Sequence, residues 1–195
     1  MRITLPSGTA AELAQPASGD AVGGLVIAPD IFGLRPLYDD LVARLATEWS
    51  LAVAAVEPFP GRDLGPDVEP RFAAVPSLDD DEHLRDLVEA ADAIAELSGV
   101  HRVGLLGFCM GGMYSFKAAR SDRFHRICAF YGMIRLPPAW AGPGHGEPLD
   151  HLAAGHPDRV LAIIGERDHY TPPDDVLALG AAGVVRAHRG PWRAW

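Results

Sequence analysis

Two patterns of apolar residues follow one another along this chain: short apolar runs, and apolar residues at helical spacing. Apolar runs of strand length lie at residues 24–28, 51–56, 103–108 and 160–164, and residues 126–131 are expected to form another strand. Between them, residues 37–49 repeat leucine at helical spacing, and residues 77–98 carry one long apolar stripe. Strands that alternate with helices in this way predict right-handed βαβ units. The expected class is therefore α/β, with a mostly parallel sheet and helices on both faces.

Residues 1–15 have a different pattern, with two short alternating pieces around Pro6, Ser7 and Gly8. This pattern predicts a hairpin at an antiparallel edge of the sheet. Further along, Ser77 is expected to cap the long helix, and the acidic run at 79–82 suits the positive end of its dipole. We interpret this run as a solvated first turn rather than a metal site.

Two segments rich in proline and glycine, residues 61–76 and 134–157, are predicted to be long loops. The second contains His145, His151 and His156, without carboxylate or cysteine partners at metal-ligand spacing. We expect these histidines at the surface.

The segment around Cys109 has the pattern of a nucleophile elbow, with cysteine in the place of serine. Cys109 lies between an apolar strand and a predicted helix, with Gly107 before it and Gly111 and Gly112 after it. A buried cysteine followed by an ordinary glycine turn would also explain the glycines. The strand before and the helix after favour the elbow. The helix N-terminus should stabilise a thiolate, so we expect the Cys109 pKa below the free value of about 8.5.

Two carboxylates follow other predicted strands. Asp30 lies in the loop after residues 24–28, and Asp168 lies beyond residues 160–164. The carboxyl ends of parallel strands meet at one edge of the sheet, so these groups and Cys109 should lie close together. The order of nucleophile and then acid is that of α/β-hydrolases, in which the histidine comes last.

Composition narrows the class of protein further. The chain has 195 residues, 48% of them hydrophobic, which is typical of one globular domain covering 1–195. A formal charge of −9 argues against nucleic acid or an anionic membrane surface as the main partner. The N-terminus has no apolar signal core, so we expect a cytoplasmic protein. The two cysteines, Cys109 and Cys128, are not spaced as zinc ligands. Cys128 is expected in the core.

Four segments together resemble the dienelactone hydrolase family of α/β-hydrolases: residues 26–33, 107–112, 130–132 and 165–172. The resemblance extends over roughly residues 4–184, and its most specific parts are the elbow and the segment around Asp168. It implies an α/β-hydrolase fold with Cys109 as nucleophile and Asp168 as triad acid. The oxyanion hole would be formed by the backbone N–H groups of Ile31 and Met110. Similar enzymes hydrolyse small lactones or esters through an acyl-cysteine intermediate, without metal or cofactor.

The chain departs from the family pattern at Asp30, where the family commonly has glutamate. In the family this carboxylate holds the resting cysteine and helps to generate thiolate. Aspartate is one methylene shorter, so two roles stay open: restraint of Cys109, or a cap of the turn or the following helix. Arg71 falls in the loop where related enzymes place a substrate-binding arginine.

The second departure concerns the catalytic histidine. The family has it in a His-Gly-Phe-like loop after one more strand, and this chain has no such motif. Only His169 and His188 follow Asp168. His169 adjoins the acid, so His188, expected in a short loop after the last strand, is the candidate base. The alternative is a solvated surface histidine.

Two functions therefore follow from the sequence. The first is a cysteine hydrolase of a small lactone or carboxylic ester, with a Cys109–His188–Asp168 triad. The second is a degenerate member of the family, which keeps the fold and ligand binding but has weak or no activity. The final strand and helix are expected to be shortened. Trp192 and Trp195 would then cover the sheet or form a subunit contact, in a monomer or a weak homodimer through the C-terminal region.

Overall fold

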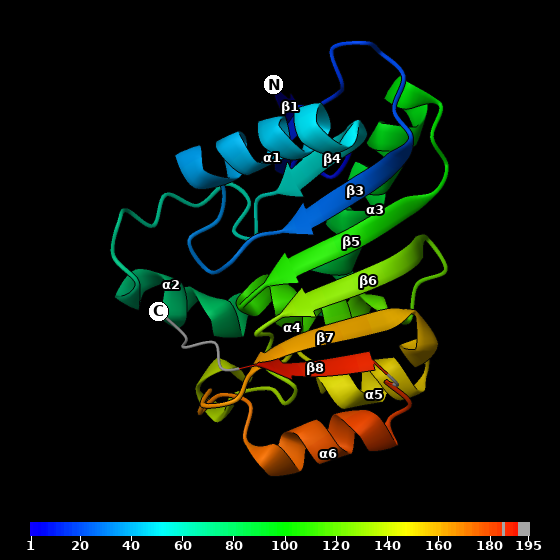
Figure 1. The fold of residues 1–195 in the computed structure, drawn as a ribbon. Helices are drawn as coiled ribbons and strands as arrows, with labels where there is room; N and C mark the ends of the chain where they lie inside the picture. The colour runs from blue at the N-terminus through cyan, green and yellow to red at the C-terminus, as the bar shows by residue number, and fades with distance from the viewer. Residues whose placement is uncertain (185, 191–195) are drawn as a thin grey trace.

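The computed structural model describes residues 1–184 and the backbone of residues 186–190. In this part of the chain the strands form one eight-stranded sheet in the order β1-β2-β4-β3-β5-β6-β7-β8 (Figure 1). The strands are β1 (Arg2–Thr4), β2 (Ala10–Ala14), β3 (Gly23–Ala28), β4 (Leu51–Val56), β5 (Val103–Phe108), β6 (Phe124–Phe130), β7 (Val160–Gly165) and β8 (Arg186–Gly190). The pairs β1–β2 and β2–β4 are antiparallel, and all later neighbours are parallel. The predicted sheet and its antiparallel hairpin edge are confirmed.

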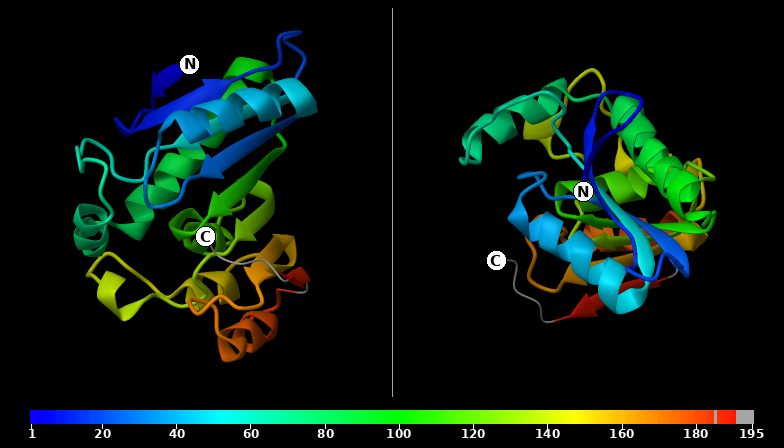
Figure 2. Two further views of the ribbon diagram at one scale, coloured as in Figure 1. Left: turned by 60° about the vertical axis from the view of Figure 1, so that its left-hand side comes forward. Right: turned by 90° about the horizontal axis from the view of Figure 1, so that it is seen from above.

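Helices lie on both faces of this sheet (Figures 1 and 2). They are α1 (Pro36–Trp49), α2 (Glu69–Ala74), α3 (Asp80–Ser98), α4 (Met110–Ala118), α5 (Pro148–Ala153) and α6 (Pro173–Ala181). Helix α1 packs on β2 and β4, and α3 and α4 pack on the opposite face. The short helices α2 and α5 lie in segments that the sequence predicted as loops. No helix in the described residues is both long and apolar enough to span a bilayer.

The two faces of the sheet are buried to different degrees. Along β5, β7 and residues 127–130 of β6, buried residues alternate with half-buried ones. Leu105 and Ala129 belong to the large core beneath α3 and α4. Leu106, Cys128 and Leu161 lie on the other face and are half-buried. Cys128 is thus less buried than the sequence predicted. Trp192 and Trp195, expected to cover the sheet or a subunit contact, lie outside the described residues.

Helix α3 is capped by Asp79 rather than by Ser77. The Asp79 backbone is extended, and its Oδ1 accepts hydrogen bonds from the N–H groups of Asp81 (2.9 Å) and Glu82 (3.1 Å). Ser77 lies in the preceding 3-10 turn, where its hydroxyl donates to the Ala74 carbonyl at 2.7 Å. The predicted cap is wrong because the turn engages the Ser77 hydroxyl before the helix begins.

A buried polar cluster joins α3 to α4 and to the segment before α5. Asp80 accepts two hydrogen bonds from Lys117 Nζ (2.7 and 2.8 Å) and one from the Gly146 N–H (2.8 Å). His145 Nδ1 and His151 Nε2 lie 3.5 and 3.4 Å from its oxygens. Lys117, the only lysine of the chain, is completely buried and needs this counter-charge. The expectations of a wholly solvated acidic run and of surface positions for His145 and His151 are therefore wrong. We call these five residues the Asp80 cluster.

Candidate active site

Cys109 lies at the sharp turn between β5 and α4, as the sequence predicted. Its backbone angles, φ 55° and ψ −115°, are strained for any residue with a side chain. The Cys109 N–H donates to the Phe130 carbonyl (3.0 Å), and its carbonyl accepts from the Met113 N–H (3.0 Å). Bonds to β6 and to the first turn of α4 thus hold the strained conformation.

The glycines around Cys109 are required by close backbone contacts. A Cβ on Gly107 would overlap the Gly111 carbonyl, and a Cβ on Gly111 would overlap the Ala28 carbonyl. A Cβ on Gly112 would lie 2.7 Å from the Gly132 Cα. The start of α4 therefore sits directly against the ends of β3 and β6, which brings the loop after β3 to the thiol.

The Cys109 thiol is mostly buried and favours its neutral form. Burial raises the pKa of the thiol to about 11, the Met110 N–H opposes that rise, and the carboxylates of Asp30 and Asp168 add to it. The expectation of a lowered pKa is wrong, because desolvation and two nearby negative groups outweigh the helix N-terminus. A nucleophilic role for this sulfur would therefore require a base that removes its proton.

The sequence predicted that the backbone amides of Ile31 and Met110 form an oxyanion hole, and this role stays a prediction. The Met110 N–H is directed at the Cys109 sulfur. Ile31 is buried in the loop that leaves β3, and within the described residues its N–H has no acceptor. Both amides come from segments held together by the contact of Gly111 with Ala28.

Asp30 is engaged by an arginine rather than by the thiol. Its carboxylate accepts Arg35 Nη1 and Nη2, both at 2.7 Å, and also the Phe32 N–H at 3.0 Å. In the described residues no hydrogen bond joins Asp30 to Cys109. The hydrogen bond to Phe32 matches the turn-capping alternative. This pairing with Arg35 was not predicted, because an arginine five residues from an aspartate is common on any surface.

Aromatic and cationic groups surround this loop. The guanidinium carbons of Arg35 and Arg71 lie 5.4 and 5.5 Å from the Phe32 ring centroid. Arg71 comes from α2, and its buried Nε has no partner among the described residues. Tyr131 follows β6 with a positive φ of 39°. Burial, the Cys109 thiol and Asp30 raise the pKa of Tyr131 to about 12, which marks a position near the sulfur that the sequence did not indicate.

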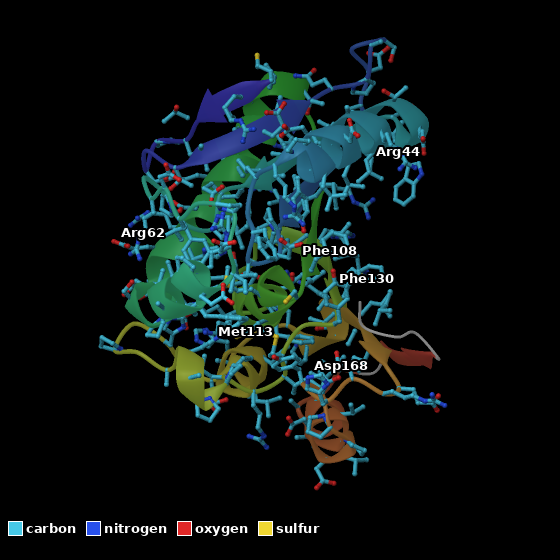
Figure 3. All side chains as sticks on the ribbon, turned by 90° about the vertical axis from the view of Figure 1, so that its left-hand side faces the viewer. Arg44, Arg62, Phe108, Met113, Phe130 and Asp168 are labelled. Atoms are coloured by element: carbon cyan, nitrogen blue, oxygen red, sulfur yellow. The ribbon has the colours of Figure 1, made fainter. Side chains whose placement is uncertain are left out.

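Asp168 follows β7 and is 7% exposed. Its Oδ1 accepts the Tyr170 N–H at 2.9 Å, and Oδ2 has no hydrogen-bond donor among the described residues. Phe108, Phe130 and Asp168 follow one another along the ends of β5, β6 and β7 (Figure 3). Cys109, Asp30 and Asp168 are therefore brought to one edge of the sheet. In the described residues no group of three or more histidine, cysteine or carboxylate side chains is arranged to hold a metal ion.

His188 lies within β8 and not in a loop beyond it. Its backbone pairs with Ile163, which pairs with Phe130, which in turn pairs with Phe108. Three steps between neighbouring strands separate β8 from β5, a distance of about 14 Å between backbones. The His188 side chain lies outside the described residues. His169 is exposed beside Asp168.

Comparison with known proteins identifies the family. The sequence model of the dienelactone hydrolase family matches residues 9–182. The chain belongs to the dienelactone hydrolase family. It is 30% identical to carboxymethylenebutenolidase 2 of Cupriavidus pinatubonensis over 164 residues, 83% of this chain and 63% of that protein. It is also 30% identical over 163 residues to a probable 2-oxo-3-(5-oxofuran-2-ylidene)propanoate lactonase of Bradyrhizobium sp., 81% of this chain and 64% of that protein.

A solved structure agrees with this assignment at the level of the fold. A protein from Klebsiella pneumoniae, provisionally assigned as a dienelactone hydrolase, superposes with a TM-score of 0.83 at 24% identity. The alignment covers 97% of this chain and 83% of that one. The α/β-hydrolase fold is thus confirmed. This dienelactone hydrolase family member spans less than two thirds of the length of the two curated relatives named above.

Proposed function

We propose that this chain hydrolyses a small lactone or carboxylic ester through an acyl-cysteine intermediate on Cys109. The observation that carries the proposal is the strained turn that presents the sulfur beside the Met110 N–H at the carboxyl end of β5. Asp168, buried at the end of β7 with no donor to its Oδ2 among the described residues, supplies a group that can orient a base. Membership in a family of hydrolases supports the same chemistry.

The reaction would proceed in two halves. A base takes the proton from Sγ, and the thiolate adds to the carbonyl carbon, so that the carbonyl oxygen becomes negative. The amides of Met110 and Ile31 donate to this oxygen. The intermediate collapses, the C–O bond breaks, and the alkoxide leaves with the proton from the base. The same base then takes a proton from water, whose oxygen attacks the acyl carbon; the C–S bond breaks, the carboxylic acid leaves, and the thiolate takes the proton back from the base.

In this proposal His188 is the base and Asp168 orients its imidazole. The protonated resting thiol makes such a base necessary, because little thiolate is present at neutral pH. A substrate with its own carboxylate would suit the site, since Arg71 lies over Phe32 beside the loop of Ile31 with its Nε unpaired among the described residues. The propanoate lactonase among the relatives is named for such a compound.

The second candidate function is a degenerate family member that binds ligand without turnover. The backbone of His188 lies within β8, three strands from the strand that carries Cys109, and this observation favours the second candidate. The two candidates differ in one measurable event, which is acylation of the sulfur followed by release.

Mass spectrometry after mixing with p-nitrophenyl acetate separates the candidates. The proposal expects a transient acetyl group on the wild type and on Cys128→Ala, which serves as the matched cysteine control. It expects none on Cys109→Ala. His188→Ala should lower the rate of nitrophenol release by about 100-fold or more. Equal turnover by His188→Ala would exclude His188 as base. A folded, reduced wild type that is never acylated would overturn the hydrolase proposal in favour of the degenerate member.

A further inference from the structure

A pocket lined by arginines lies at the opposite end of the sheet from Cys109. It has a volume of about 390 Å³ and contains Arg102, Arg123, His125, Arg126 and Arg159. We call these five residues the basic pocket. They precede or begin β5, β6 and β7, whose other ends carry the candidate active site (Figure 1). Six residues of β5 separate the two ends, about 20 Å of extended chain, so the basic pocket is a distinct place on the molecule.

Two of the arginines are held by backbone carbonyls. Arg123 donates to the carbonyls of Ala91 (2.6 Å) and His101 (3.2 Å) and pairs through Nε with Asp92 at 2.7 Å. Arg159 Nη1 donates to the Phe124 carbonyl at 3.3 Å. Their side chains are only 19% and 25% exposed. These guanidinium groups are therefore positioned before any ligand arrives, which lowers the entropic cost of binding.

The other two arginines have no carboxylate partner among the described residues. Arg102 Nη2 lies 2.6 Å from His125 Nε2, and Arg126 Nη1 donates to the His125 carbonyl at 2.7 Å. The pKa of His125 is lowered by Arg102 first, and also by Arg126 and Arg159. A guanidinium can only donate, so His125 Nε2 accepts the hydrogen bond from Arg102. Positive charge is left uncompensated at this point of a chain whose net charge is −9.

We propose that the basic pocket binds the phosphate group of a small molecule. Guanidinium groups match phosphate oxygens in pairs, and two fixed and two uncompensated guanidinium groups can neutralise a dianion. The pocket volume suits a compact ligand. An extended polyanion such as nucleic acid fits poorly, because the neighbouring hollow is lined by Asp92 and Glu96 and the whole chain is acidic.

One carboxylate competes with such a ligand. Asp122 lines the pocket, with its carboxylate 3.5 Å from Arg159 Nη2 and 2.7 Å from His156 Nε2. Its side chain is 87% exposed, so solvent weakens both contacts. Asp122 places a negative charge where the phosphate would bind. Its removal should strengthen binding, whereas removal of an arginine should weaken it.

Isothermal titration calorimetry at constant ionic strength tests the proposal, with inorganic phosphate and inorganic pyrophosphate as probes and sodium chloride as blank. We expect saturable binding to the wild type, weakened about tenfold in Arg126→Gln through loss of one charge-assisted contact. Asp122→Asn should bind more tightly than the wild type. Arg44→Gln, a variant of an exposed arginine on α1, is the matched control and should bind unchanged.

The outcome separates ligand types and can overturn the proposal. Tighter binding of pyrophosphate indicates a diphosphate ligand, and equal binding indicates a monophosphate. Absence of saturable binding of both probes would overturn the proposal, as would an equal loss in Arg126→Gln and Arg44→Gln. Thermal midpoints of all variants without ligand verify that they are folded. None of these residues lies near Cys109, so the result is independent of the proposed hydrolysis.

Discussion

The Cys109 thiol lies near the carboxylates of Asp30 and Asp168, and the Asp30 carboxylate is paired with Arg35. Asp30 raises the pKa of the thiol, while its own carboxylate is paired in two hydrogen bonds with Arg35. Changes at Asp30 and at Arg35 should therefore act on the sulfur in opposite directions. Such a pair of variants tests an electrostatic effect separately from a structural one.

The rate of alkylation by iodoacetamide measures this effect, in a Cys128→Ala background so that only Cys109 reacts. Only thiolate reacts, so with a thiol pKa of about 11 the rate should rise about tenfold per pH unit between about pH 7 and pH 10. Asp30→Asn removes a negative charge, lowers the pKa and speeds alkylation at pH 8. Arg35→Gln leaves the negative charge of Asp30 without its partner, which raises the thiol pKa and slows alkylation. Identical pH profiles for both variants and the parent would reduce Asp30 to a structural turn residue.

At the scale of elements, the Asp80 cluster fixes α3 against α4. Burial by itself would raise the pKa of the Asp80 carboxyl, but hydrogen bonds from His151, the Gly146 N–H and Lys117 hold it well below its usual range. A lowered pKa stabilises the folded protein above the unfolded value of about 3.9, and this stabilisation is lost as the pH falls below it. At neutral pH the stabilisation of the folded protein by the lowered Asp80 pKa is therefore fully present.

Removal of one charge from the cluster should destabilise the protein strongly. Asp80→Asn leaves the Lys117 ammonium buried without a counter-charge, and Lys117→Met does the converse. Each should lower the free energy of unfolding at pH 7 by about 3–5 kcal/mol. The combination of Asp80→Leu with Lys117→Met should recover part of that loss. Urea unfolding measures all of these.

Asp81→Asn is the matched control, because Asp81 is exposed and pairs with Arg120 at the surface. Its effect should stay within about 0.5 kcal/mol. If Asp80→Asn changed stability no more than Asp81→Asn, the cluster would not hold the two helices together.

The sequence predicted well those features that depend on a local pattern of apolar residues. It predicted poorly those that depend on contacts between residues far apart in the chain. The runs at 51–56 and 103–108 match β4 and β5 residue for residue, because apolar runs of that length fit few other structures. Asp80 and Lys117 are 37 residues apart, so hydropathy cannot distinguish a first-turn carboxylate that faces solvent from one that faces a buried lysine. The same holds for His145, which lies in the segment before α5 and whose carboxylate neighbour, Asp80, comes from α3.

The candidate site was predictable in part for the same reason. Cys109 and its glycines are contiguous and reflect one local turn, so the pattern identified them. Asp30 and Asp168 could be placed at the strand ends by topology alone. The raised thiol pKa and the pairing of Asp30 with Arg35 depend on burial and side-chain direction, which a linear pattern does not contain. The roles of Ile31, Met110 and His188 stay predictions.

At the scale of the whole molecule, one large core links the first strands to the last helices. Its members extend from Leu5 to Val184, and a smaller core lies on the other face beneath α1. The sheet separates the two cores but joins every strand of both. We therefore propose that residues 1–195 form a single domain that unfolds as one unit.

Differential scanning calorimetry and circular dichroism test this proposal. One transition is expected, with the same midpoint in the far and near ultraviolet and a calorimetric enthalpy equal to the van't Hoff enthalpy. The Asp80→Asn variant should lower this single midpoint rather than split it. Two resolved transitions, or different midpoints for the two spectral regions, would show that the sheet divides between β3 and β5 into two parts that unfold separately.

The order of the strands has a consequence for how the chain assembles. β5 pairs with β3, β6 with β5, β7 with β6, and β8 with β7. In this half the sheet therefore grows in one direction as the sequence proceeds. During synthesis, a strand that leaves the ribosome meets a neighbour already in place. Each new strand also leaves its own edge open until the next arrives, and an open edge is a template for pairing with another chain. The speed of translation between residues 130 and 160 thus sets how long the edge of β6 stays exposed to aggregation.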